Sequence, residues 1–311
     1  MDNSSSSVII GAIALLLTAP INIAMLIQFF KFWKFIRKYV WYGFTVGIVY
    51  YLIVLIFNII STAITQSGLS AAYILSHIIS AAKLMGIAML GIYYCRRLNL
   101  AGFPFAKYII NKKKAEATKA RPSVMVLDSP SIVASTLRWG NVESISLPDS
   151  TRKPDIKKAV WAVIIISAAG IFYSLILFHL TNPTITREVI ERELFAFGDL
   201  KPPIYFSLIT AVMAAWGEEI TFRLGIQNFL AIYLKLGRSD YWAAIMITAF
   251  LWTLLHWGNI EPGWVKMVQI FPAGLALGWA FKKYGVEVCI ATHAIFNVIL
   301  VLIFPVQTPL Q

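Results

Sequence analysis

Residues 214–223 read Ala-Ala-Trp-Gly-Glu-Glu-Ile-Thr-Phe-Arg, a polar stretch inside an otherwise apolar part of the chain. It brings three ionisable side chains, Glu218, Glu219 and Arg223, into one short segment. At the centre of a membrane helix, insertion scales assign each charged side chain a cost of about 2.5–3.5 kcal/mol. These three groups must therefore pair with one another or serve a function.

The composition of the chain indicates a membrane protein. Of its 311 residues, 59% are hydrophobic and 14% are charged, whereas soluble domains are about 45–50% apolar and about 25% charged. Two cysteines, Cys95 and Cys289, lie far apart and indicate neither a disulfide framework nor a cysteine-based metal site. We predict an all-α fold, a polytopic transmembrane helical bundle.

The apolar runs predict the number of membrane spans. A helix needs about 20 mainly apolar residues to cross a bilayer, and the chain contains about eight such runs, with a basic polar insert after the third. The expected spans are roughly 8–30, 40–64, 69–94, 159–181, 203–222, 241–258, 264–281 and 286–305.

The positive charge is concentrated in one polar segment. The formal net charge is +12, and residues 95–158 hold 13 Lys or Arg against 5 Asp or Glu. Because Lys and Arg accumulate in cytoplasmic loops, we expect 95–158 to be a basic cytoplasmic insert of a multi-pass plasma-membrane protein. It separates accessory N-terminal transmembrane helices, 1–94, from a transmembrane core, 159–311, that carries the polar motifs.

The distribution of Lys and Arg predicts eight spans with both termini outside, but it creates one conflict. Glu218 then lies near the inner end of span five and His256 near the outer end of span six, so the two could not easily meet. Re-entry of residues 223–236 into the bilayer, or their lying along it, would remove this conflict. Residues 184–201 are expected to form a polar or interfacial helix.

The two neighbouring glutamates are expected to have different partners. Glu219 and Arg223 are four residues apart, so they share a helix face and can pair. Glu218 is rotated by about 100° from Glu219 and must face something else. The sequence therefore predicts a structural pair and one free carboxylate that can act as a base.

Two further segments repeat the four-residue spacing with histidines. The indole of Trp252 can pack over the imidazole of His256 and hold its orientation. His293 and Asn297 place an imidazole and an amide on one helix face, where they can orient a carbonyl or donate to an oxyanion. Together with Glu218, these residues indicate a hydrolytic site.

At this point a family resemblance becomes specific. The three motifs resemble those of the CPBP family, the CAAX-protease and bacteriocin-processing (Abi) intramembrane endopeptidases, which are relatives of the Rce1-type prenyl protease. The resemblance covers about residues 200–305, and Trp252 stands where this family more often has Phe. In chain order the motifs are Glu218-Glu219-x-x-x-Arg223, Trp252-x-x-x-His256 and His293-x-x-x-Asn297.

The resemblance implies an endopeptidase that hydrolyses peptide bonds of membrane-associated or lipidated substrates, with residues 159–311 as its peptidase core. Glu218 resembles the glutamate that activates water, with His256 assisting. His293 and Asn297 resemble the pair that holds the oxyanion. The supporting positions are Glu219, Arg223 and Trp252.

The sequence leaves the metal question open. The family is classed with metallopeptidases, and Glu218, His256 and His293 could supply three ligands to one zinc ion with an open fourth position. The His-Glu-x-x-His motif common in zinc peptidases is absent, so a metal-free mechanism is equally open. The expected partners are the lipid bilayer and a peptide or protein substrate, with prenylated peptides among the candidates and no nucleic acid.

Two other classes of function compete with a peptidase. A non-catalytic CPBP-like membrane scaffold or a bacteriocin self-immunity protein would keep the motifs as a structural network. A secondary transporter would use intramembrane Glu and His as a proton relay, with polar residues spread over inverted repeats. In the first three spans His77 and Lys83 are the ionisable exceptions, and this confinement of the site favours the peptidase.

Overall fold

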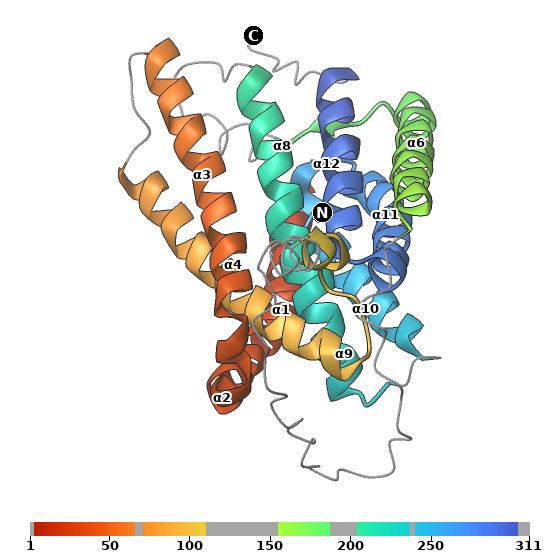
Figure 1. The fold of residues 1–311 in the computed structure, drawn as a ribbon. Helices are drawn as coiled ribbons and strands as arrows, with labels where there is room; N and C mark the ends of the chain where they lie inside the picture. Colours follow the sequence, from red (N-terminus) through yellow and green to blue (C-terminus); the bar gives the residue numbers. More distant parts are fainter. Residues whose placement is uncertain (1–2, 66–70, 110–154, 187–203, 237–239, 304–311) are drawn as a thin grey trace, which may run out of the picture.

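The computed structural model describes residues 3–65, 71–109, 155–186, 204–236 and 240–303, and these residues form a bundle of helices (Figure 1). The helices are α1 (Asn3–Lys31), α2 (Trp33–Ile36), η1 (Arg37–Tyr39), α3 (Val40–Thr65), α4 (Ala71–Arg97), α6 (Ile156–Thr181), α8 (Ile204–Glu218), η2 (Glu219–Gln227), α9 (Asn228–Tyr233), α10 (Tyr241–Leu254), η3 (Trp257–Asn259), α11 (Gly263–Tyr284) and α12 (Val286–Ile303). Two short strands, β1 (Thr184–Ile185) and β2 (Ile260–Glu261), complete the described elements.

The outer surface of the bundle is apolar, as a lipid-facing surface must be. Among the described residues, six helices are long and apolar enough to cross a membrane: α1, the segment from α2 through most of α3, α4, α6, α11 and α12. Leu16 on α1, and Trp161 and Leu180 on α6, expose 73%, 61% and 75% of their surfaces. The protein is an integral membrane protein, and the predicted all-α class is confirmed.

The predicted span count and one predicted boundary differ from the structure. The runs expected at 203–222 and 241–258 are not among the six, because α8 has 15 residues and α10 has 14. The end predicted at residue 222 is wrong, since α8, η2 and α9 continue without a break from 204 to 233. Arg223 does not mark the end of this helix, because its guanidinium is fully buried against Glu219.

This continuous helix removes the conflict between Glu218 and His256. Glu218 lies near the middle of the 204–233 run, and α10 returns antiparallel beside it, so His256 follows the end of α10 close to Glu218. Of the segment 223–236, for which re-entry into the bilayer or a position along it was considered, the residues up to 233 continue the helix. The segment η2 is a π-helix, a rare conformation that occurs frequently at functional sites.

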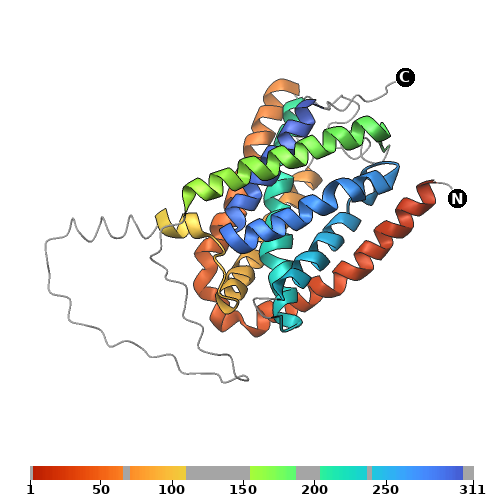
Figure 2. The same ribbon diagram turned by 90° about the vertical axis from the view of Figure 1, so that its right-hand side faces the viewer.

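The N-terminal helix α4 packs closely on η2. A Cβ at Gly91 would lie 2.5 Å from Leu224 Cγ, and one at Gly225 would lie 2.7 Å from Ile87 Cγ2. Only glycine permits these two approaches, one from each helix. On the other side of the bundle, α6 lies across α11 and α12 (Figure 2).

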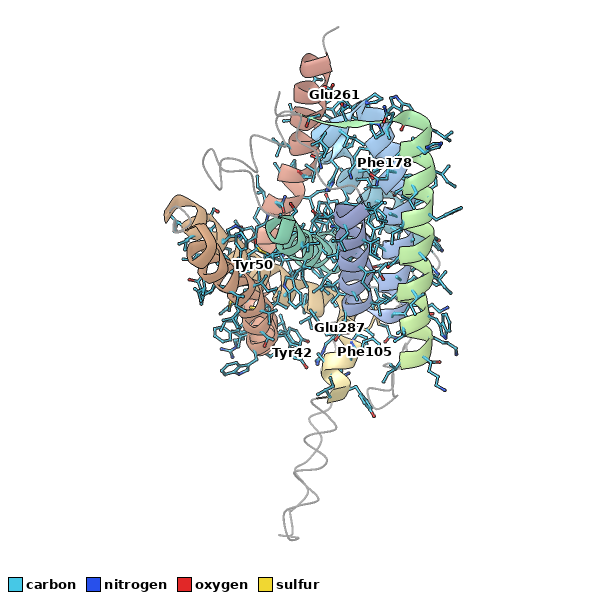
Figure 3. The ribbon with its side chains drawn as sticks, turned by 90° about the horizontal axis from the view of Figure 1, so that it is seen from above. Tyr42, Tyr50, Phe105, Phe178, Glu261 and Glu287 are labelled. Carbon is cyan, nitrogen blue, oxygen red and sulfur yellow. The ribbon has the colours of Figure 1, made fainter. Side chains whose placement is uncertain are left out.

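Two predictions outside the helical core fall partly on described residues. The helix expected at 184–201 begins instead with β1. This strand pairs antiparallel with β2, and Thr184 lies opposite Glu261. Residues 187–201 lie outside the described residues. Of the insert 95–158, residues 95–97 end α4, residues 104–109 are helical and residues 156–158 begin α6, so both predicted bounds lie inside flanking helices; residues 110–154 lie outside the described part. The amides of Phe105 and Ala106 donate to Glu287 at 3.2 and 2.8 Å, which ties this short helix to α12 (Figure 3).

Candidate active site

Glu218 is held between two side chains from the end of α10. Its Oε2 accepts a hydrogen bond of 2.5 Å from the indole Nε1 of Trp252, and its Oε1 lies 3.6 Å from Nε2 of His256. The indole and imidazole rings are 5.2 Å apart at 66°, so Trp252 packs edge-on against His256. The packing of these two rings follows the predicted i, i+4 spacing, whereas the indole hydrogen bond to Glu218 is a contact that the sequence reasoning missed.

The backbone fixes the tautomer of His256. Its Nδ1 lies 2.8 Å from the carbonyl oxygen of Trp252. Because a carbonyl can only accept, Nδ1 carries a hydrogen and Nε2 faces Glu218. A bare Nε2 and a bare carboxylate would repel each other, so the Glu218–His256 pair favours one shared proton or a water that donates to both.

Glu219 is the centre of a separate and fully buried network. Arg223 Nε donates to its Oε2 at 3.1 Å, and His293 Nδ1 lies 2.9 Å from its Oε1. The side chains of Glu219 and Arg223 are 0% exposed and that of His293 is 5% exposed. The predicted Glu219–Arg223 pairing is present, and the two glutamates face different partners.

The contact between Glu219 and His293 is a second feature that sequence reasoning missed. It joins residues 74 positions apart, and no local spacing signals it. Since Glu219 is a carboxylate that accepts from Arg223, the Nδ1 of His293 must donate to it, which leaves Nε2 pointing elsewhere. Trp252 contacts both networks, because it donates to Glu218, Arg223 lies over its ring at 5.0 Å, and its ring centre is 5.4 Å from that of His293 at 84°.

Asn297 lies one helical turn beyond His293 but does not join either glutamate. Its Nδ2 is 3.5 Å from the carbonyl oxygen of Ala211 on α8, which is the outer limit of a hydrogen bond. Among the described residues no hydrogen bond links Asn297 to Glu218 or Glu219. The structure therefore brings Glu218, Trp252 and His256 together and places Asn297 at the edge of the site.

The described side chains do not form a three-ligand metal site. No group of three or more His, Cys, Asp or Glu side chains in the described part of the chain is arranged to hold a metal ion. We therefore derive no step through a metal.

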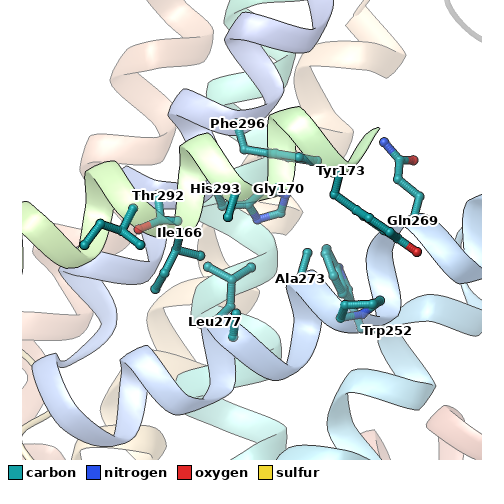
Figure 4. Close-up of a pocket in the computed structure, with 14 residues that line it drawn as sticks. Ile166, Gly170, Tyr173, Trp252, Gln269, Ala273, Leu277, Thr292, His293 and Phe296 are labelled. Carbon is teal, nitrogen blue, oxygen red and sulfur yellow. The ribbon is translucent and has the colours of Figure 1, made fainter. Parts of the chain in front are cut away.

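Two cavities of different character flank this cluster. One, of about 320 Å³, lies between α6, α11 and α12, and Trp252, His293 and Gln269 are among its mostly apolar lining residues (Figure 4). Gln269 Nε2 donates to Ser174 Oγ at 3.1 Å. The second cavity, of about 510 Å³, lies between α8 and the N-terminal helices, and Glu218 forms part of its wall. Glu218 is thus reached from one side and His293 from the other.

The residues of this site lie in the part of the chain that is similar to known proteins. Residues 200–299 match the family model described as type II CAAX prenyl endopeptidase Rce1-like. A stretch of 92 residues is 28% identical to the sporulation-killing factor biosynthesis protein SkfC of Bacillus subtilis (strain 168), and it covers 29% of this chain and 18% of that relative. No solved structure matches the chain significantly. Residues 200–299 are therefore similar to the Rce1-like CAAX prenyl endopeptidases, the protease family that the three motifs resemble.

Proposed function

We propose that this protein is an intramembrane endopeptidase in which Glu218, assisted by His256, activates a water molecule. The observation that supports this most directly is the division of labour between neighbouring glutamates. Glu219 is tied to Arg223 and His293, whereas Glu218 is held by Trp252 and faces His256 across 3.6 Å at the wall of a cavity. A carboxylate kept out of the ion pair is available to accept a proton.

The attack on the peptide bond follows from this geometry. A water bound to Glu218 Oε1 and His256 Nε2 gives a proton to Glu218 as its oxygen adds to the carbonyl carbon. The proton then passes to the nitrogen of the leaving amine, and the carbon–nitrogen bond breaks. Positioned general bases of this kind contribute about 10²–10⁴-fold in rate, and the indole of Trp252 keeps Glu218 aimed at the water.

We assign to His293 the stabilisation of the charge that develops on the carbonyl oxygen. Its Nδ1 is fixed by Glu219, so a proton on Nε2 makes an imidazolium whose charge the buried carboxylate balances. A donor aimed at such an oxyanion is worth about 10²–10³-fold in rate. Asn297 becomes a second donor if its amide turns away from the long contact with Ala211.

The substrates that fit this site are peptides at the membrane. The apolar cavity beside Trp252 and His293 suits a lipidated or apolar segment, as in a prenylated CAAX tail. The name of the relative from Bacillus subtilis associates that protein with the biosynthesis of a killing factor, so a precursor of a secreted peptide is a second substrate class.

The proposal is tested by comparing peptide termini in membranes of cells that produce the wild type or Glu218→Gln at equal abundance. Glu261→Gln is the matched control, because Glu261 is an exposed glutamate on β2 outside the site. We expect a set of termini that is present in the wild type and the control and lost in Glu218→Gln. Identical termini in all three would instead support a non-catalytic scaffold.

A further inference from the structure

The larger of the two cavities contains a lysine that the catalytic proposal does not use. This cavity, of about 510 Å³, is walled by α8 and η2 on one side and by α1, α3 and α4 on the other. Among its described lining residues, Lys83 is the one lysine or arginine and Glu218 is the one acid. The N-terminal helices therefore bring a cation to the same cavity as the proposed catalytic base.

Lys83 is in a costly position that calls for a partner. Its side chain is exposed and lies near the middle of α4, one of the helices long enough to span the membrane, where insertion scales assign a charged side chain a cost of about 2.5–3.5 kcal/mol. Within the described residues, no carboxylate lies within 4.0 Å of its ammonium. An exposed lysine at the middle of such a helix, with no described acid beside it, is suited to an anion supplied by a ligand.

The packing of α4 places Lys83 beside the catalytic helix. The next residue, Leu84, lines the same cavity, and its Cδ1 lies 3.9 Å from the position of a Cβ at Gly217. Gly217 immediately precedes Glu218. One turn further along, Ile87 packs on Gly225 of η2. A ligand in this cavity therefore contacts both the face of α4 next to Lys83 and the stretch of chain that carries Glu218.

The remaining wall offers hydrogen-bonding groups that suit a peptide backbone. Tyr50 on α3 forms a 2.8 Å hydrogen bond between its hydroxyl and Nδ1 of His77 on α4. Asn22 Nδ2 donates to the carbonyl of Thr18 at 3.0 Å, which leaves its side-chain oxygen as an acceptor. This wall contrasts with the mostly apolar lining of the cavity beside His293.

We propose that the cavity beside Glu218 binds the carboxyl-terminal end of the peptide substrate and that Lys83 pairs with its terminal carboxylate. This inference rests on the proposed peptidase function. The scissile bond then lies at Glu218, the short carboxyl-terminal fragment lies toward Lys83, and the apolar part of the substrate lies toward Trp252 and His293. Lys83 selects peptides that end close to the cleaved bond.

Binding, rather than turnover, tests the inference independently of the catalytic proposal. The full chain carries His256→Ala, which removes the assisting histidine and keeps the Glu218 side chain in the cavity, and is placed in phosphatidylcholine nanodiscs. Two peptides of one membrane-associated sequence are compared, one ending in a free carboxylate and one in an amide. We expect the acid to bind about 10- to 100-fold more tightly, as for a hydrogen bond to a charged group.

Substitutions of single lysines test whether Lys83 is the residue that pairs with the terminal carboxylate. Lys83→Gln should reduce the acid-to-amide ratio to near one while leaving the affinity of the amide unchanged, and Lys83→Arg should keep the ratio. Lys266→Gln is the control, since Lys266 is a lysine on α11, another helix long enough to span the membrane, and is not among the described residues that line this cavity; it should keep the ratio as well.

Several results would overturn the assignment of Lys83. The first two are equal affinities for the acid and the amide, and no binding of either peptide. The others are an acid-to-amide affinity ratio that is unchanged in Lys83→Gln, or one that is lost in Lys266→Gln. Equal peptide affinities with weakened binding of phosphatidylglycerol in Lys83→Gln would assign the lysine to a lipid phosphate. In each case, termini lost in Glu218→Gln membranes would still support the peptidase.

Discussion

Removing the carboxylate of Glu219 should destabilise the fold as well as the site. Glu219→Leu leaves Arg223, which is 0% exposed, without the acceptor that its Nε now reaches at 3.1 Å. Breaking a buried pair by deleting one partner costs about 3–5 kcal/mol, because the remaining charge stays buried without compensation. The loss of the His293 contact at 2.9 Å adds to this cost. We therefore expect a decrease of at least about 3 kcal/mol in the free energy of unfolding.

A double-mutant cycle separates the pair from general damage. The free energies of unfolding of the wild type, Glu219→Leu, Arg223→Met and the double variant are measured by denaturant titration in one detergent. Replacing both partners with apolar residues of similar volume is often nearly neutral, so the double variant should be more stable than either single variant. Additive losses, or a loss below about 1 kcal/mol in Glu219→Leu, would refute the reasoning because directly paired residues must couple.

Three further predictions address the site and the helix contact. Trp252→Phe keeps an aromatic ring but removes the indole donor to Glu218, so peptide turnover of the folded protein should fall about 10- to 100-fold; full turnover would show that the hydrogen bond is dispensable. Turnover should survive EDTA and 1,10-phenanthroline, because no step here uses a metal; its loss, restored by zinc, would contradict the metal-free mechanism. Gly91→Ala should destabilise the protein by about 1–3 kcal/mol, since its Cβ would meet Leu224 at 2.5 Å. Gly86→Ala on the same helix, with its nearest atom at 3.9 Å, is the control and should be nearly neutral in the same denaturant titration.

Local spacing predicted the contacts that lie on one helix. The Glu219–Arg223 pair and the packing of Trp252 on His256 both follow from a separation of four residues. The contacts between helices could not be read in this way. The hydrogen bonds from Trp252 to Glu218 and from His293 to Glu219 cross 34 and 74 positions, and only the packing of three helices creates them.

The error in topology has a physical cause. The span predicted from the apolar run ended at residue 222, immediately before the charged Arg223. In the structure the arginine is neutralised inside the bundle by Glu219, and the helix continues through the π segment to Tyr233. Sequence alone does not show whether a charged residue has a buried partner, and the position of Glu218 along its helix depended on that fact.

The central claim, that Glu218 is the base of a peptidase, is tested most directly with purified protein reconstituted in lipid. A peptide identified from the membrane comparison is incubated with the wild type, Glu218→Gln or Glu261→Gln, and the products are quantified by mass spectrometry. The account predicts equal cleavage by the wild type and Glu261→Gln, and a rate lower by at least about 10²-fold in Glu218→Gln. Cleavage by Glu218→Gln at the wild-type rate would contradict it.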